Sequence, residues 1–106
     1  MKIFAIVAAL LLLTACESER DRIIAAGKPI YDANCKTCHA QGINGAPIVG
    51  NSRMWSKRAS QGEDVLVEHA MNGFGLMPAK GGNASLTEDE IRKVVKFYFA
   101  SLPESN

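Results

Sequence analysis

The stretch from Cys35 to His39, with the sequence CKTCH, constrains this chain more than any other feature. Two thiols that are separated by two residues and followed at once by a histidine are typical of a covalent attachment site for c-type haem. One helical turn places the thiols of Cys35 and Cys38 on the same face, where each can add to one vinyl group along a haem edge. The imidazole of His39 can then bind the iron as the proximal ligand. The motif therefore predicts a fold built around one covalently bound haem c.

Two other kinds of site use the same cysteine spacing. A C-x-x-C pair can form a redox dithiol, or it can supply half of the ligands of a zinc site. The chain has 3 cysteines and 2 histidines, without a second C-x-x-C pair and without two histidines close together in sequence. A zinc site would therefore lack ligands, and haem attachment is the favoured interpretation.

The N-terminal residues have the pattern of an export signal. Residues 3–13 form an unbroken apolar run behind Lys2. A helix that spans a bilayer needs about 20 residues, so this run fits the core of a signal peptide instead. The next residues, Leu13-Thr14-Ala15-Cys16, resemble the lipobox of bacterial lipoproteins. That resemblance implies cleavage before Cys16 and acylation of its thiol and of the new amino group; an ordinary cleaved signal that abuts a cysteine is the alternative.

These patterns divide the chain into three parts. We expect residues 1–15 to be a cleaved lipoprotein signal peptide, residues 16–21 a lipidated, charged tether, and residues 22–106 a single monohaem domain. Cys16 would carry lipid and the other two cysteines haem, which leaves no thiol for a disulfide. The expected location is the periplasmic face of a bacterial membrane, held there by the lipid anchor, with inner and outer membrane both open.

Composition excludes one class of partner and raises a question of stability. The chain has 12 Lys plus Arg against 11 Asp plus Glu, and so lacks the basic excess of a nucleic-acid-binding domain. A domain of this size buries only about 60% of the surface of its unfolded chain. Because a haem would supply much of the apolar core, we expect the haem-free protein to be poorly folded.

Hydrophobic periodicity predicts an all-α domain with long glycine-rich loops. Helices are expected over residues 21–34, over residues 61–72, and from Thr87 to Pro103. Residues 40–54 and 74–84 are read as ordered loops. In the first helix, Pro29 predicts either a kink or a helix that begins near Lys28.

The C-terminal helix has the clearest local signals. The sequence Thr87-Glu88-Asp89-Glu90 has the T-x-x-E form of a capping box. Its predicted inner face consists of Ile91, Val94, Val95, Tyr98 and Leu102.

The second axial ligand of the iron has several candidates in the sequence, namely Met54, His69, Met71 and Met77. Met77 is favoured because it lies in the loop Gly73–Pro78, where glycines permit close approach of the backbone and proline stiffens the chain. The competing interpretation is that Met77 only fills the core, as many methionines do. A lone helical histidine such as His69 is more often a packed or surface residue than a ligand.

Several motifs of the chain together resemble those of the class I c-type cytochromes, and most of all those of the short bacterial cytochromes of the c-five kind. The resemblance extends over residues 26–102. It rests on Gly27-Lys28-Pro29-Ile30-Tyr31, Cys35–His39, Gly45-Ala46-Pro47 with Trp55-Ser56-Lys57-Arg58, and Gly75-Leu76-Met77-Pro78-Ala79-Lys80-Gly81-Gly82. It implies a small class I fold, with three to four helices and long loops wrapped around one haem.

The resemblance also implies roles for particular residues. Met77 would be the distal iron ligand, and the Pro47 carbonyl would accept the ring N–H of His39. Trp55 and Arg58 would contact a haem propionate, although Trp55 can equally be core and Arg58 part of a solvated cationic face. In addition, the resemblance implies that Gly27 and Tyr31 cross the terminal helix near Val95 and Tyr98.

These features favour an electron-transfer protein over an enzyme. The predicted function is a membrane-anchored, monomeric monohaem carrier that passes single electrons between transient redox partners through an iron ligated by His39 and Met77. No general base, nucleophile or substrate pocket is evident in the sequence. The alternatives are a haem sensor or peroxidase-like enzyme whose sixth ligand is displaced by a small molecule, and a haem subunit docked to an oxidoreductase complex.

Overall fold

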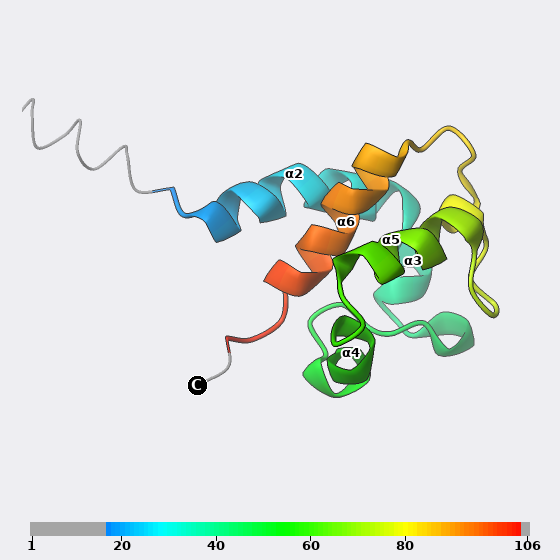
Figure 1. Cartoon of the computed structure of the whole chain (residues 1–106), viewed down its shortest axis with the longest axis horizontal. Helices are drawn as coiled ribbons and strands as arrows, with labels where there is room; N and C mark the ends of the chain where they lie inside the picture. Colours follow the sequence, from blue (N-terminus) through cyan, green and yellow to red (C-terminus); the bar gives the residue numbers. More distant parts are fainter. Residues whose placement is uncertain (1–16, 105–106) are drawn as a thin grey trace, which may run out of the picture.

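The computed structural model describes residues 17–104, and these residues form a helical domain (Figure 1). Its elements are α2 (Glu19–Asn34), α3 (Lys36–His39), α4 (Ser52–Ala59), α5 (Glu63–Asn72) and α6 (Glu88–Ala100), with short 3₁₀ turns at Ile43–Gly45 and Ala79–Gly82. Between residues 17 and 104 the only β-type pairing is one isolated bridge, from Phe74 to Met77. The all-α prediction is therefore confirmed. The predicted signal peptide and Cys16 lie outside the described residues.

Helix α2 begins earlier than the sequence predicted. The Ser18 hydroxyl accepts a hydrogen bond from the backbone N–H of Asp21 at 3.1 Å, and the Asp21 carboxylate accepts one from the N–H of Ser18 at 3.3 Å. This capping box starts the helix at Glu19. Residues 19–21 of the expected tether are therefore part of the helix, because Asp21 satisfies its N-terminus.

Proline at position 29 does not interrupt α2, which continues to Asn34. The alternative of a helix that begins near Lys28 is therefore wrong. Proline removes one backbone donor, so the carbonyl one turn earlier loses its partner. Pro29 itself is exposed, where water can satisfy that carbonyl, and the ion pair from Lys28 Nζ to Asp32 Oδ2 at 2.7 Å spans the same turn.

Helices α2 and α6 cross at close range, and Gly27 lies at the contact (Figure 1). A Cβ atom at Gly27 would meet the Lys93 carbonyl oxygen and would lie 2.5 Å from Cβ of Phe97. Tyr31 packs one turn later, with ring centroids 5.0 Å from Phe97 and 5.7 Å from Tyr98. The predicted close approach at Gly27 is confirmed, but its partners on α6 are Lys93 and Phe97.

The predicted capping box at the start of α6 is confirmed. The hydroxyl of Thr87 accepts from the N–H of Glu90 at 3.2 Å, and the Glu90 carboxylate accepts from the N–H of Thr87 at 3.1 Å. The helix ends at Ala100, three residues before Pro103. Its buried residues are Ile91, Val94, Val95, Phe97 and Tyr98, of which the sequence analysis missed Phe97.

Helix α4 was not predicted, because its first residues fall in the stretch that was read as a loop. Asn51 caps it by accepting a hydrogen bond from the N–H of Met54 at 3.1 Å. Trp55 is its one buried residue. The helix therefore depends on the burial of one indole ring, which is a weak periodic signal in a sequence.

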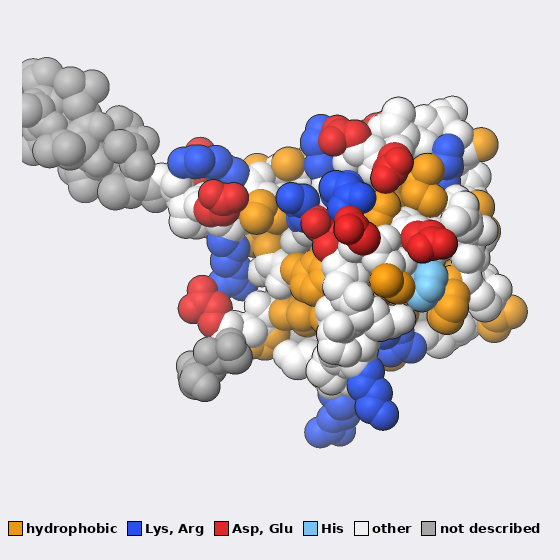
Figure 2. All heavy atoms as spheres, in the orientation of Figure 1, with side chains coloured by type: hydrophobic (Ala, Val, Ile, Leu, Met, Phe, Trp, Pro, Cys, Tyr) orange, Lys and Arg blue, Asp and Glu red, His pale blue; other side chains and the backbone are white. Residues whose placement is uncertain are grey.

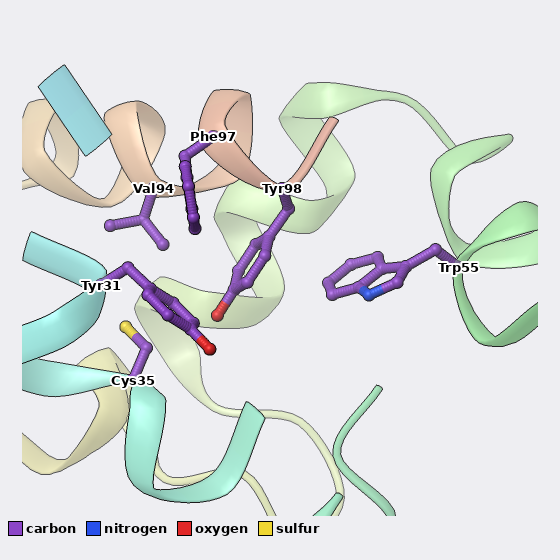
Figure 3. Packing of buried hydrophobic residues seen from close by; sticks show 6 residues of the cluster. All are labelled: Tyr31, Cys35, Trp55, Val94, Phe97 and Tyr98. Carbon is purple, nitrogen blue, oxygen red and sulfur yellow. The ribbon is translucent and has the colours of Figure 1, made fainter. Parts of the chain in front are cut away.

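The core has two clusters, and α6 contributes residues to both. The first contains Tyr31, Cys35, Trp55, Val94, Phe97 and Tyr98 (Figure 3). The second contains Val67, Leu86, Ile91 and Val95, between α5 and α6. In the part of the chain from 17 to 104, no helix has both the length and the apolar character needed to span a bilayer.

Candidate haem site

An open cavity of about 310 Å³ lies beside the first core cluster. Its walls come from the end of α2, from α3, α4, α5 and α6, and from the loops that contain Pro47 and Met77. The cavity brings together all the predicted site residues that lie within 17–104, namely Cys35, Cys38, His39, Pro47, Trp55, Arg58 and Met77. Residues from positions 35 to 77 thus meet at one site, although they are far apart in sequence.

The two predicted attachment cysteines lie on one helical turn. The backbone N–H groups of Cys38 and His39 both donate to the Cys35 carbonyl, at 3.3 and 3.0 Å. Cys35 is buried, Cys38 is half-buried, and both side chains are free thiols. Burial raises the pKa of the Cys35 thiol. Both thiols line the cavity, which is the arrangement that two attachments along one haem edge require.

His39 is held in an orientation that suits a metal ligand. Its side chain is only 7% exposed, and its Nδ1 lies 2.9 Å from the carbonyl oxygen of Pro47. Because a carbonyl only accepts, Nδ1 carries the proton and Nε2 keeps its lone pair. Burial lowers the pKa of His39, which favours the neutral, ligating form. This is the contact with Pro47 that the family resemblance implied.

Trp55 and Arg58 reach the cavity from α4. The indole N–H of Trp55 donates to the Ile48 carbonyl at 2.8 Å, and its ring stacks on Tyr98 with a centroid distance of 4.7 Å. The indole N–H is therefore engaged by the protein and not offered to a propionate. The guanidinium of Arg58 donates through Nη1 to the Met54 carbonyl and keeps its other donors for a ligand.

Met77 closes a short hairpin, defined here as the Phe74–Met77 hairpin. Phe74 and Met77 exchange two backbone hydrogen bonds of 3.1 and 2.9 Å. Gly75 occupies the first central position with φ +55°, as a type II′ turn favours. At Gly73, with φ +85°, an added Cβ would lie 3.0 Å from the Met77 carbonyl oxygen. The backbone on both sides of the thioether is therefore fixed, with glycine required at Gly73.

The same loop is tied to the end of α2. The Asn83 side-chain amide donates to the side-chain oxygen of Asn34 at 2.8 Å, and Asn34 also lines the cavity. A Cβ at Gly81 would lie 3.0 Å from the Asn34 carbonyl oxygen. Sequence reasoning missed this link, because two asparagines separated by many residues carry no periodic or motif signal.

The other candidates for the second ligand are less well placed. Among the methionines between 17 and 104, Met77 alone lines the cavity, and Met71 packs against the second core cluster instead. His69 does line the cavity, but its ring stacks on Phe74 with centroids 4.1 Å apart and an interplanar angle of 16°. Of the four candidates, Met77 and His69 therefore line the cavity, whereas Met54 and Met71 do not.

The donor set fits a c-type haem. One cavity holds two thiols, an imidazole with a free Nε2 and a thioether, and its other walls are largely apolar and aromatic. Across residues 17–104 no cluster of 3 or more His, Cys, Asp and Glu side chains could hold a metal ion, so a zinc site has no ligand set there.

Comparisons with known proteins point the same way. Residues 22–97 match the protein family described as cytochrome C oxidase, cbb3-type, subunit III. Cytochrome c-555 of Chlorobaculum tepidum is 47% identical over 77 residues, which is 69% of this chain and 71% of that protein. Cytochrome c5 of Ectopseudomonas mendocina is 35% identical over 69 residues, covering 63% and 79% of the two chains.

A solved structure shares the fold as well. It is the crystal structure of an electron transfer complex of nitrite reductase with cytochrome c, which matches with a TM-score of 0.68 and 34% identity. The match covers 72% of this chain and 93% of the other. The helical fold of this chain is therefore shared with that matched chain.

Proposed function

The chain belongs to the c-type cytochrome family, and from that premise we propose that it carries electrons through a haem iron ligated by His39 and Met77. As its relatives indicate, it holds one covalently bound haem c and is an electron-transfer protein, not an enzyme. The observation that carries the ligand assignment is the convergence of Cys35, Cys38, His39 and Met77 on one cavity.

Each of these residues has a distinct task. Cys35 and Cys38 hold the haem covalently through their sulfur atoms. The Pro47 carbonyl fixes the tautomer and ring orientation of His39 and raises the basicity of Nε2. The haem supplies the one-electron chemistry.

The remaining residues control access and charge. The thioether of Met77 would occupy the sixth coordination position, and its backbone is fixed by the Phe74–Met77 hairpin. A filled sixth position keeps small molecules from the iron, which separates a carrier from a sensor or a peroxidase-like enzyme. Trp55 and Tyr98 form an aromatic wall of the cavity, and Arg58 would offer a positive charge to a propionate.

Carbon monoxide binding tests this function. We expect the reduced native holoprotein not to bind carbon monoxide and reduced Met77→Ala to bind it rapidly. The ferric form of Met77→Ala should also lack the far-red absorbance of the sulfur–iron bond. Met71→Ala is the matched control, because Met71 packs in the second core cluster and should behave as the native protein does. Rapid binding by the native protein would contradict the carrier function and favour a ligand-binding haem protein.

The proposal also places the carrier at a membrane. Cys16, in the lipobox-like sequence, would anchor the protein on the periplasmic face of a bacterial membrane as a monomer. Its partners would be redox proteins met transiently, and the related cytochrome c in complex with nitrite reductase supports that class of partner. Cys16→Ser should release the protein into the soluble periplasmic fraction, whereas Glu17→Gln should not. Unchanged membrane retention of Cys16→Ser would refute the anchor.

A further inference from the structure

Residues 73–86, called here the Met77 loop, connect α5 to α6. At one end Phe74 stacks on His69, with ring centroids 4.1 Å apart, and at the other end Leu86 is buried in the second core cluster. The one charged residue of the loop, Lys80, takes part in no ion pair among residues 17–104. Figure 2 shows mainly backbone and uncharged side chains along the edge that this loop forms, unlike the red and blue side chains over α2 and α6. Apolar contacts therefore hold the two ends of the loop, and the residues between them depend on other interactions.

One hydrogen bond connects the Met77 loop to another part of the fold. In the described part of the chain, the only hydrogen bond that joins the loop to a residue outside it runs from Nδ2 of Asn83 to Oδ1 of Asn34, at 2.8 Å. We call it the Asn34–Asn83 link. Asn34 is the last residue of α2 and directly precedes Cys35. The link therefore joins the loop that carries the proposed iron ligand to the helix that leads into the attachment motif.

Further hydrogen bonds fix the orientation of both amides. Oδ1 of Asn83 accepts from the backbone N–H of Ser85 at 3.1 Å, which leaves Nδ2 to donate to Asn34. Nδ2 of Asn34 donates to the Ile30 carbonyl at 3.0 Å, which leaves Oδ1 to accept. Both side chains are partly buried, so water competes less for these bonds than it would at an exposed site. Neither amide can turn over without losing a partner.

The backbone of the loop is strained beside this link. Lys80 has φ +55°, in the left-handed region that costs free energy for a residue with a side chain. Such a residue keeps its conformation only where the surrounding structure holds it. Asn34 also approaches the loop through its backbone, since a Cβ at Gly81 would lie 3.0 Å from the Asn34 carbonyl oxygen. Asn34 therefore restrains the loop directly after the strained residue, through both its carbonyl and its side chain.

We propose that Asn34 and Asn83 are positioning residues that hold the Met77 loop closed, and that they thereby set how often the thioether of Met77 leaves the iron. The proposal rests on the Met77 ligation proposed above, and it adds the residues that control it. Loss of one hydrogen bond of ordinary net strength shifts a local opening equilibrium about fivefold. A small anion that binds ferric iron only after the thioether has left should therefore bind about fivefold faster without the link.

Cyanide binding to the ferric holoprotein measures this opening. For Asn34→Ala, we expect a stopped-flow rate constant about fivefold above that of the native protein. Alanine favours a helix more than asparagine does, so weaker helix formation in α2 would not account for the increase. Asn34→Ala also leaves the contact between Asn83 and Ser85 in place. An unchanged rate constant would overturn the proposal.

Ser18→Ala is the matched control for a general loss of stability. It removes half of the capping box at the opposite end of α2, and it should shift the unfolding equilibrium of the whole domain about fivefold. Because this end of the helix is distant in sequence from the link, the cyanide rate constant should stay within about twofold of the native value. Equal increases for Ser18→Ala and Asn34→Ala would overturn the proposal, since both would then report global stability.

A double-mutant cycle tests whether the two side chains act as one link. Asn83→Ala also removes the acceptor for the N–H of Ser85, so it should accelerate cyanide binding about fivefold or more. In the Asn34→Ala background, the same substitution should have an effect about fivefold smaller than in the native protein. A double variant whose acceleration is the product of the two single accelerations would contradict a shared link.

Hydrogen exchange makes the test independent of ligand binding. The backbone amides of Gly81 and Asn83 donate hydrogen bonds within the loop, at 3.2 and 3.1 Å. In the ferrous holoprotein, Asn34→Ala should speed the exchange of both amides about fivefold and leave that of Val95 in α6 unchanged. A uniform increase over the whole protein, or no increase in the loop, would refute the role of the link.

The native protein and Met77→Ala separate failure of this proposal from failure of the proposed function. If these two proteins bind cyanide equally fast, Met77 does not fill the sixth position, and both proposals fail. If the native protein binds cyanide slowly, Met77→Ala binds it rapidly and Asn34→Ala matches the native protein, only the role of the Asn34–Asn83 link fails.

Discussion

Gly27→Ala is the sharpest test of the packing between α2 and α6. By helix propensity alone, alanine in place of a helical glycine should stabilise the protein by about 1 kcal/mol. The structure predicts the opposite, because the new methyl group would meet the Lys93 carbonyl oxygen and Cβ of Phe97, the latter at 2.5 Å. Neither atom lies at the end of a flexible side chain, so the two helices must move apart.

The size of the effect follows from these two opposing terms. Overpacking of this kind costs about 3 kcal/mol, at the upper part of the usual range, and the propensity gain leaves a net loss of about 2 kcal/mol. For a domain of this size, that loss corresponds to a fall in melting temperature of about 10 °C. The melting temperatures of the native and variant ferric holoproteins can be measured from the loss of the helical circular dichroism signal on heating.

A neighbouring position provides the control for this prediction. Ala26→Ser adds one atom of similar size at an exposed position of the same helix, and it should change the stability by less than about 0.5 kcal/mol. A Gly27→Ala protein as stable as the native protein, or more stable, would refute the close crossing of α2 and α6.

Three further predictions concern the capping box of α6, the covalently bound haem and the two buried tyrosines. Thr87→Ala removes one half of the capping box and should cost about 1 kcal/mol in a denaturant titration, without changing the absorption spectrum. A protein with Cys35→Ala and Cys38→Ala should lose covalent haem and its cooperative thermal transition, and retention of a native-like transition would contradict the haem-dependent core. Burial raises the pKa of both Tyr31 and Tyr98 above the ordinary value of 10.0, so above that pH the unfolded state releases protons that the folded state retains. The unfolding free energy should therefore be unaffected by these groups below pH 10 and decline above it, and Tyr31→Phe should weaken the decline.

The sequence predicted correctly those elements that are determined by residues close together in the chain. The cap at Thr87 and the apolar spacing after it identified α6, because both act within a few residues. The motif from Cys35 to His39 predicted, for the same reason, the helical turn that brings both thiols to one cavity. Family resemblance supplied the partner of His39, and the structure places the Pro47 carbonyl at hydrogen-bond distance from its ring.

The parts that were missed depend on tertiary contacts. Helix α4 buries a single side chain, that of Trp55, so its sequence has little periodic signal. The continuity of α2 through Pro29 could not be predicted either, because it depends on the position of Pro29 on the exposed side of the helix, where water can satisfy the carbonyl that loses its donor. The link between Asn34 and Asn83 joins two distant loops, and nothing local marks either residue as a partner of the other.

The central claim is that this cavity holds one electron-transferring haem c with His39 and Met77 as axial ligands. A spectroelectrochemical titration of the purified holoprotein tests it most directly. We predict one reversible, one-electron transition, with the far-red sulfur–iron band present in the ferric protein and absent from ferric Met77→Ala. A native ferric spectrum without that band, or identical spectra for the native and variant proteins, would contradict the account.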